Sequence, residues 1–246
     1  LASIVPITFF HLLNTSEDTS LRWQYGSFLR LIRLLASFVA IFLPGLYLAL
    51  TLYHQEMIPT DLLYSLTKAR ENIPFPTVLE LLLMEISFEL IREAGLRVPG
   101  VIGQTLGIIG AVILGQAAVS GGIVSPVLII VVAITGLGSF AIPNFSISFG
   151  YRLMRFVFLF FGAIAGFYGI AAAIVIFGSI ACSMKSFGVP YFSPLAPVTK
   201  TSPDLVIRGP YWKQTERADF LNTQNRKRSG NTVRGWVNQP SRGQGK

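Results

Sequence analysis

Residues 34–53, LLASFVAIFLPGLYLALTLY, contain no charged side chain and decide the class of fold. As an α-helix such a stretch is about 30 Å long, which matches the hydrocarbon core of a bilayer. The rest of the chain has the same character, because 52% of its 246 residues are hydrophobic and only 13% are charged. A soluble domain of this length carries roughly twice that share of charge. The sequence therefore predicts an all-α, polytopic integral membrane protein.

Three further apolar runs follow, at residues 101–119, 123–142 and 156–181. The first two are separated by a short Ser-Gly-Gly stretch, which predicts a helical hairpin. Together with residues 34–53 the runs predict about four transmembrane helices. An even number of spans leaves both ends of the chain on the same side of the membrane.

The distribution of basic residues orients these spans. Residues 183–246 carry eleven Lys or Arg and three Asp or Glu. Positively charged segments next to spans stay on the cytoplasmic side. We therefore expect a cytoplasmic approach segment at residues 1–33, a transmembrane domain at 34–181, and a basic cytoplasmic tail at 182–246. The composition after residue 215 is too polar to fold by itself and predicts a largely disordered segment.

Residues 78–94 interrupt this apolar pattern with carboxylates and predict an amphipathic helix. Placed at 100° per residue, Glu85 and Glu89 lie on one arc together with Arg92 and Glu93. Two interpretations are open. The helix can lie at the membrane interface with its charges in water. Alternatively, Glu85 and Glu89 of several copies form rings that attract cations to a pore mouth.

The run at residues 101–119 has two distinct sides. Small residues on one side allow close helix packing, and its glycines are Gly103, Gly107, Gly110 and Gly115. The opposite side carries Thr105, Gln116 and Val119. A glutamine inside a membrane is costly unless it bonds another helix or meets water. Gln116 thus indicates either helix-to-helix hydrogen bonding or a pore lined by Thr105, Gln116 and Val119, with the valine as a constriction.

Enzymatic function finds little support in the sequence. The two histidines, His11 and His54, lie outside the predicted spans, and Cys182 is the single cysteine. No nucleophile with a base and no metal-ligand spacing is present. We therefore expect no catalysis, no metal and no cofactor. The basic run NRKRSG at residues 225–230 fits anionic lipid headgroups better than nucleic acid, because it follows a membrane domain. The alternative is a solvated tail whose charge only sets the topology.

Three stretches carry a resemblance to a known family: PFPTVLELLLMEISFELIREAGLRVPGVIGQTLGIIGAVILGQAAV, AIPNFSISFGYRLMRF and SFGVPYFSPLAP. Together they resemble the membrane domain of the GerA family, the A subunits of the nutrient germinant receptors of endospore-forming bacteria. The similarity covers roughly residues 1–215. It includes the family's short motifs REAG at residues 92–95 and GQAAV at 115–119.

This resemblance implies a multi-pass subunit in the inner membrane of a bacterial endospore. It implies a transporter-like B subunit and a C lipoprotein as partners, besides membrane lipids. It further implies a homo-oligomer that forms a nutrient-gated cation channel and triggers germination. The alternative is a non-conducting scaffold that assembles the receptor and relays the germinant signal.

The predicted orientation is testable by cysteine labelling. In a Cys182→Ser background, a cysteine placed at Asn225 should resist a membrane-impermeant reagent added outside, because the basic tail is expected in the cytoplasm. Permeabilised membranes supply the control, in which the same cysteine should react. Labelling of intact vesicles from outside would place the tail on the opposite side.

Overall fold

The computed structural model describes residues 6–98 and 101–198, together with positions 204, 207–210, 214, 216–219, 223–225 and 227. Within these ranges the side chains of residues 19, 96, 101–106, 108 and 145 are left out of the description. The tail that we expect to be disordered after residue 215 lies mostly outside the described residues. The chain divides into two compact units, residues 1–34 with 178–246 and residues 35–177.

Two helices in the described residues are long and apolar enough to cross a membrane. These are α2, Trp23–Leu52, and the part of α7, Phe145–Ser183, that begins at Ser146. Shorter apolar helices lie at Ile109–Ser120 and Pro126–Phe140. The chain is therefore mainly helical, as predicted, whereas the count of four spans stays a prediction.

The first unit contains short elements around the beginning of α2. Helix α1, Phe9–Leu13, and the 3-10 helix η1, Ser16–Thr19, precede α2. A two-stranded antiparallel sheet joins β1, Lys185–Ser186, to β2, Val189–Pro190. Phe10 is buried in a small apolar cluster of this unit.

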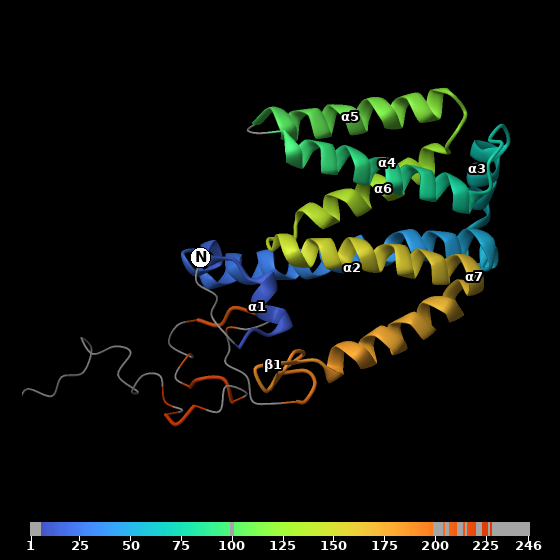
Figure 1. Ribbon diagram of the computed structural model, residues 1–246. Coiled ribbons are helices and arrows are strands. Elements are labelled where there is room, and N and C mark those ends of the chain that lie inside the picture. Colours follow the sequence, from blue (N-terminus) through green and yellow to red (C-terminus); the bar gives the residue numbers. More distant parts are fainter. Residues whose placement is uncertain are drawn as a thin grey trace, which may run out of the picture. The chain divides into compact units, whose positions relative to one another are not determined.

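The second unit is a bundle of helices. It holds most of α2, the 3-10 helix η2 at Gln55–Met57, α3 at Thr60–Arg70, α4 at Thr77–Arg97, α5 at Val101–Ser120, α6 at Pro126–Phe140 and most of α7. Figure 1 shows α4 and α5 side by side, with α6 between this pair and the α2–α7 pair. Helix α6 begins where Ser125 caps it by accepting a hydrogen bond from the Leu128 N–H and Pro126 occupies the first turn.

Glycines let the helices of this bundle touch through their backbones. A Cβ atom at Gly162 of α7 would lie 2.7 Å from the Gly45 carbonyl oxygen of α2, and one at Gly45 would lie 2.8 Å from the Phe158 carbonyl. A Cβ atom at Gly138 of α6 would lie 2.9 Å from the Ala36 carbonyl of α2. Larger residues at these positions would force the helices apart.

Helix α4 buries Glu80 and Glu85 and exposes several large apolar side chains, whereas Glu93 and Arg97 near its end are exposed. Glu85 is 1% exposed, whereas Leu79, Ile86 and Leu90 are 50–66% exposed. This is the reverse of a helix lying on a surface with its charges in water. Such an arrangement suits a helix whose exposed side meets hydrocarbon and whose charges find partners inside the bundle.

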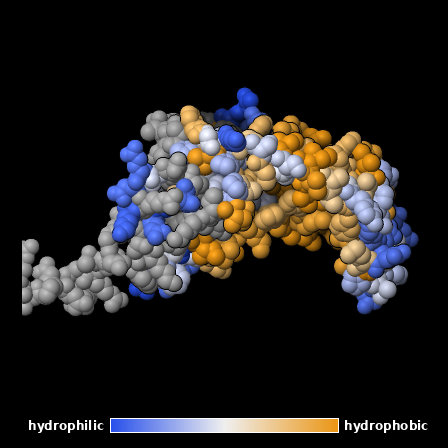
Figure 2. All heavy atoms as spheres, turned by 90° about the horizontal axis from the view of Figure 1, so that it is seen from below, coloured by the Kyte–Doolittle hydropathy of each residue, from blue (hydrophilic) through white to orange (hydrophobic). Residues whose placement is uncertain are grey.

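The exposed surface of the second unit carries a continuous apolar band. On the face shown in Figure 2, hydrophobic side chains cover the middle of this unit, and hydrophilic ones gather at the end where Figure 1 places α3. Exposed large side chains of this unit include Ile130, Leu137, Phe160 and Val175. An apolar band of this kind is typical of a surface in contact with lipid.

Helix α7 is broken within the run that we expected to form one span. Gly166 has φ 59° and ψ −136°, a conformation that glycine adopts far more readily than other residues. Figure 1 shows the two arms of α7 meeting in a sharp bend. The Tyr53 hydroxyl lies 2.8 Å from the Ala163 carbonyl oxygen and 2.7 Å from that of Ile164. Tyr53 thus caps the end of the first arm.

Removing either part of this cap should destabilise the bundle. Tyr53→Phe loses a hydrogen bond worth about 1 kcal/mol. Gly166→Ala should cost ~1–3 kcal/mol, because alanine strains at positive φ, and its Cβ would lie 3.0 Å from atoms of both Tyr53 and His54. Gly150→Ala is the control within α7, since a Cβ there meets nothing within 4 Å. Thermal unfolding in detergent measures the effect, and equal stability of all three variants would contradict the assigned bend.

Candidate functional site

Two ion pairs join α4 to α7 inside the second unit. Arg155 donates from Nη1 to Glu85 Oε2 at 2.7 Å, and both side chains are at least 96% buried. One helical turn away, Arg152 pairs with Glu89, whose side chain is 32% exposed. The carboxylates that the sequence places on one arc of a helix therefore face two arginines of another helix.

Further hydrogen bonds connect this layer to α2 and α6. Arg155 donates from Nε to the Ala40 carbonyl of α2 at 2.9 Å. Arg92 of α4 donates from Nη2 to the Ser139 hydroxyl of α6 at 2.6 Å, and its guanidinium carbon lies 4.4 Å from the centre of the Phe140 ring. We call these five charged side chains the ionic layer: Glu85, Glu89, Arg92, Arg152 and Arg155.

The ionic layer is costly to bury and sensitive to damage. Taking one partner from a buried ion pair typically costs ~3–5 kcal/mol, because the other charge is left in a low-dielectric surrounding. Within the described residues, Glu85 Oε1 and Arg155 Nη2 are buried without a hydrogen-bond partner. The pair between these two residues therefore leaves one atom on each side without a hydrogen bond, and a buried ion pair of this kind is weak evidence for stability.

The sequence alone did not identify Arg152 and Arg155 as parts of the site. The last apolar run in the sequence, residues 156–181, begins just after these two arginines and so excludes both from the predicted span. The structure begins α7 at Phe145 and keeps both arginines inside the helix. Their spacing of three residues, which puts them on one face of a helix, was the available signal.

A second charged group lies at the other end of α4. Glu80, 1% exposed, accepts hydrogen bonds from Arg70 at 3.2 Å and from the Ser125 N–H at 3.1 Å. The beginning of α6 is thereby held against α4, because a carboxylate is favoured near the N-terminus of a helix. This contact gives Glu80 a role separate from that of the carboxylates that face α7.

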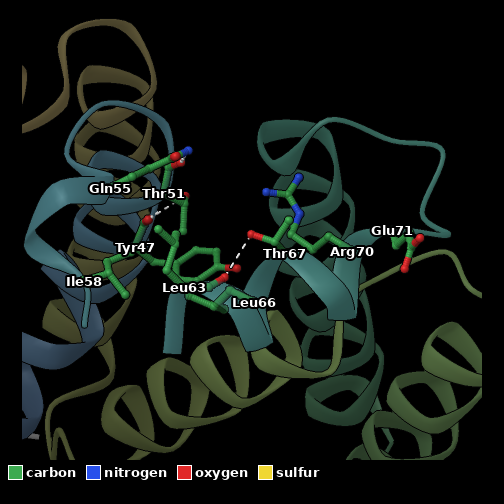
Figure 3. A pocket seen from close by; sticks show the side chains of 9 residues that line it. All are labelled: Tyr47, Thr51, Gln55, Ile58, Leu63, Leu66, Thr67, Arg70 and Glu71. Atoms are coloured by element: carbon green, nitrogen blue, oxygen red, sulfur yellow. Dashed lines mark hydrogen bonds between the residues drawn. The ribbon is translucent and has the colours of Figure 1, made fainter. Parts of the chain in front are cut away.

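A cavity of about 370 Å³ lies where α2 ends and α3 runs past it. Figure 3 shows the side chains around it, which come from Tyr47, Thr51, Gln55, Ile58, Leu63, Leu66, Thr67, Arg70 and Glu71. The hydroxyls of Thr51 and Thr67 donate to carbonyls of their own helices. The charged groups that line the cavity are Arg70, which is bound to Glu80, and the exposed Glu71. Within the described residues, the Tyr47 hydroxyl and Arg70 Nε are buried without a hydrogen-bond partner.

The first unit has a charged cluster of its own. Both terminal nitrogens of Arg33 donate to the carboxylate of Asp18 at 2.6 Å. Burial opposes ionisation of Asp18, but the hydrogen bonds from Arg33 and from the Thr15 N–H outweigh it and lower the pKa of this carboxyl to about 2. Arg30 adds a contact with Asp204 at 3.1 Å. The arginines that orient the first predicted span therefore also tie the preceding segment to α2.

The residues predicted to line a pore lie on α5. Gln116 is exposed and Val119 is half-buried. Thr105 and Gly103 belong to the helix, but the surroundings of both residues lie outside what the structure describes. A pore-lining role for Thr105, Gln116 and Val119 stays a prediction, as does cation attraction by Glu85 and Glu89.

The glycines of α5 divide into two groups. A Cβ atom at Gly110 would lie 3.6 Å from Ile91 of α4, and one at Gly115 would lie 3.6 Å from Ile129 of α6. A Cβ atom at Gly107 would meet nothing within 4 Å. Gly110 and Gly115 therefore pack within the chain, whereas Gly107 leaves an open place on the surface of α5.

The described residues contain no group of three His, Cys, Asp or Glu side chains close enough together to hold a metal ion. The chemistry available in the ionic layer is therefore the attraction and repulsion of charge. Such a layer can pair helices, or it can act on ions that pass beside it.

Comparison with known proteins places the chain among spore germination proteins. The family described as "Bacillus/Clostridium GerA spore germination protein" matches residues 1–220. Spore germination protein KA of Bacillus subtilis (strain 168) is 42% identical over 94% of this chain and 43% of its own length. Spore germination protein GerLA of Bacillus cereus is 40% identical over 91% of the chain and 46% of its own length.

A third relative is the "Uncharacterized membrane protein YfkQ" of Bacillus subtilis (strain 168). It is 44% identical over 86% of this chain and 42% of its own length. The chain thus spans less than half the length of these three curated relatives. No solved structure matches the chain.

The glycines of α5 generate a prediction that separates assembly from folding. Gly110→Leu should lower the thermal stability of a single chain, by ~1–3 kcal/mol for overpacking against Ile91. Gly107→Leu should leave that stability within about 0.5 kcal/mol and reduce crosslinking between chains, because its open place suits a neighbouring helix. Ile109→Leu, at a half-exposed position, is the control. Equal crosslinking of all three variants would show that this side of α5 is no interface.

Proposed function

The chain belongs to the GerA family of spore germination proteins, and from this premise we propose that it is the membrane subunit of a nutrient germinant receptor. In this proposal several copies assemble in the inner membrane of the endospore into a nutrient-gated cation channel. The transporter-like B subunit and the C lipoprotein of the receptor are its partners. Membrane lipids surround the apolar band of the second unit.

The observation that carries the channel proposal is the ionic layer. A bundle with an apolar exterior brings five charged side chains together between α4, α6 and α7, and three of them, Glu85, Arg152 and Arg155, are buried. Ionisable side chains at membrane depth are expensive, and they mark ion pathways more often than they stabilise a fold. In the proposal α4 lies in the membrane with the other helices, because Leu79, Ile86 and Leu90 are exposed on it while Glu85 is buried against α7.

Roles for individual residues follow from their positions. Glu85 and Glu89 attract cations, as rings of carboxylates do in cation channels. Thr105, Gln116 and Val119 line the pathway on α5, and Val119 forms a hydrophobic constriction that keeps it dry. The exposure of Gln116 is compatible with a wetted surface between chains.

A second function, a scaffold without conductance, is favoured by the pairing of the carboxylates. Glu85 and Glu89 each have an arginine partner. A carboxylate neutralised in this way joins helices and attracts no cation. The two functions differ in whether the assembled receptor passes current.

The decisive experiment is a conductance measurement on the complete receptor in a planar bilayer. With nutrient present we expect a cation current, and without nutrient none. Val119→Ser should raise the nutrient-independent current by roughly tenfold or more, because a hydroxyl wets a hydrophobic constriction. Val175→Ser is the matched control, since it makes the same change at a side chain that is 67% exposed.

The outcomes separate the parts of the proposal. A complete, nutrient-binding receptor without any current would establish the scaffold. Nutrient-gated current with unchanged leak in Val119→Ser would retain the channel and remove the constriction. Equal leak in Val119→Ser and Val175→Ser would attribute the effect to general loosening of the helices.

A further inference from the structure

The two ion pairs between α4 and α7 stand one above the other. Glu85 and Glu89 are four residues apart on α4, and Arg155 and Arg152 are three residues apart on α7. The helices therefore run in opposite directions along this contact, and each carboxylate meets one arginine. While the contact lasts, the negative charge of α4 is neutralised and gives a passing cation little attraction.

The two sides of the contact are anchored differently. Arg155 also donates to the Ala40 carbonyl of α2, and α2 is held to α7 by the close approach of Gly45 and Gly162. Arg152 donates to the Ser148 carbonyl of its own helix. The arginines thus keep bonds to α2 and α7 that do not involve α4.

The carboxylates belong to the other half of the bundle. Helix α4 packs along α5, where a Cβ at Gly110 would contact Ile91. Within the described residues, the second oxygen of Glu85 is buried without a partner. If α4 separates from α7, Arg155 and Arg152 stay bonded to α2 and α7, while Glu85 and Glu89 leave with α4 and lose these two partners. Of the arginines in the ionic layer, Arg92 alone belongs to α4 and stays near the carboxylates.

We infer that Arg155 and Arg152 determine the ion selectivity of this subunit by masking Glu85 and Glu89 in the closed state and releasing them when α4 separates from α7. The inference rests on the proposed channel function. It adds a role for Arg155 and Arg152, whose charge is opposite to that of the cation-attracting carboxylates. It also accounts for the incomplete pairing of Glu85 with Arg155. A pair optimised for stability would give hydrogen bonds to Glu85 Oε1 and Arg155 Nη2 as well.

The test breaks the same pair from either side. Arg155→Gln leaves the carboxylate of Glu85, and Glu85→Gln leaves the guanidinium of Arg155. Both changes remove one hydrogen-bonded charge of similar depth and put the same residue in its place. Reversal potentials of the complete receptor in a KCl gradient give the permeability ratio of potassium to chloride, without nutrient and with it.

Both variants should leak without nutrient, because each loses the contact that holds α4 against α7. In Arg155→Gln the ratio should rise about tenfold, and in Glu85→Gln it should fall about tenfold, since one unit charge of opposite sign remains beside the pathway. Arg155→Lys keeps the charge and should stay close to the wild-type ratio. Glu93→Gln and Arg97→Gln alter the exposed pair at the end of α4 and should leave the ratio within about twofold.

Folding is controlled separately. If either buried variant fails to assemble, Arg152→Gln and Glu89→Gln provide the same comparison at the pair whose carboxylate is partly exposed. The inference would be overturned if the wild-type receptor conducts and the permeability ratios of the arginine and glutamate variants shift in the same direction or do not change. A wild-type receptor that binds nutrient and passes no current would instead overturn the proposed channel, and the selectivity role with it.

Discussion

The burial of Glu85 against Arg155 constrains the rest of the second unit. Charges inside an apolar bundle must be paired, and a pair at 2.7 Å allows little freedom in the register of α4 along α7. Arg155 extends the constraint to α2 through the Ala40 carbonyl. Three helices from distant parts of the chain are thereby positioned by one guanidinium, and the second pair at Arg152 repeats the constraint one turn away.

Glycines allow α2 and α7 to pack closely through their backbones, which charge pairing alone does not achieve. The approach of α2 and α7 at Gly45 and Gly162 brings carbonyl groups within van der Waals contact of the neighbouring helix, which side chains of any size would prevent. In a bilayer such packing replaces much of the hydrophobic driving force that holds helices together in water. Helices α2 and α7 pack tightly, whereas the contact between α4 and α7 is polar. The α4–α7 contact is therefore better suited to open than the α2–α7 contact.

The bend at Gly166 gives α7 two roles. Its first arm carries Arg152 and Arg155 of the ionic layer, and its second arm contains the residue at which the second unit ends along the chain, Phe177. Tyr53, from the end of α2, binds the carbonyls at the break. The same two helices that meet at the glycines therefore also define where α7 changes direction, so a movement of α2 against α7 would act on both features.

Much about this protein was determined by its sequence alone. The apolar runs, the helix at residues 78–94 and the family followed from composition, periodicity and motifs, because these depend on neighbours along the chain. The partners of the carboxylates did not, since Glu85 and Arg155 are seventy residues apart and local rules place arginine outside a span. Only the tertiary structure decided that the charged side of α4 faces inward, because that choice depends on which helix offers an opposite charge at the same depth.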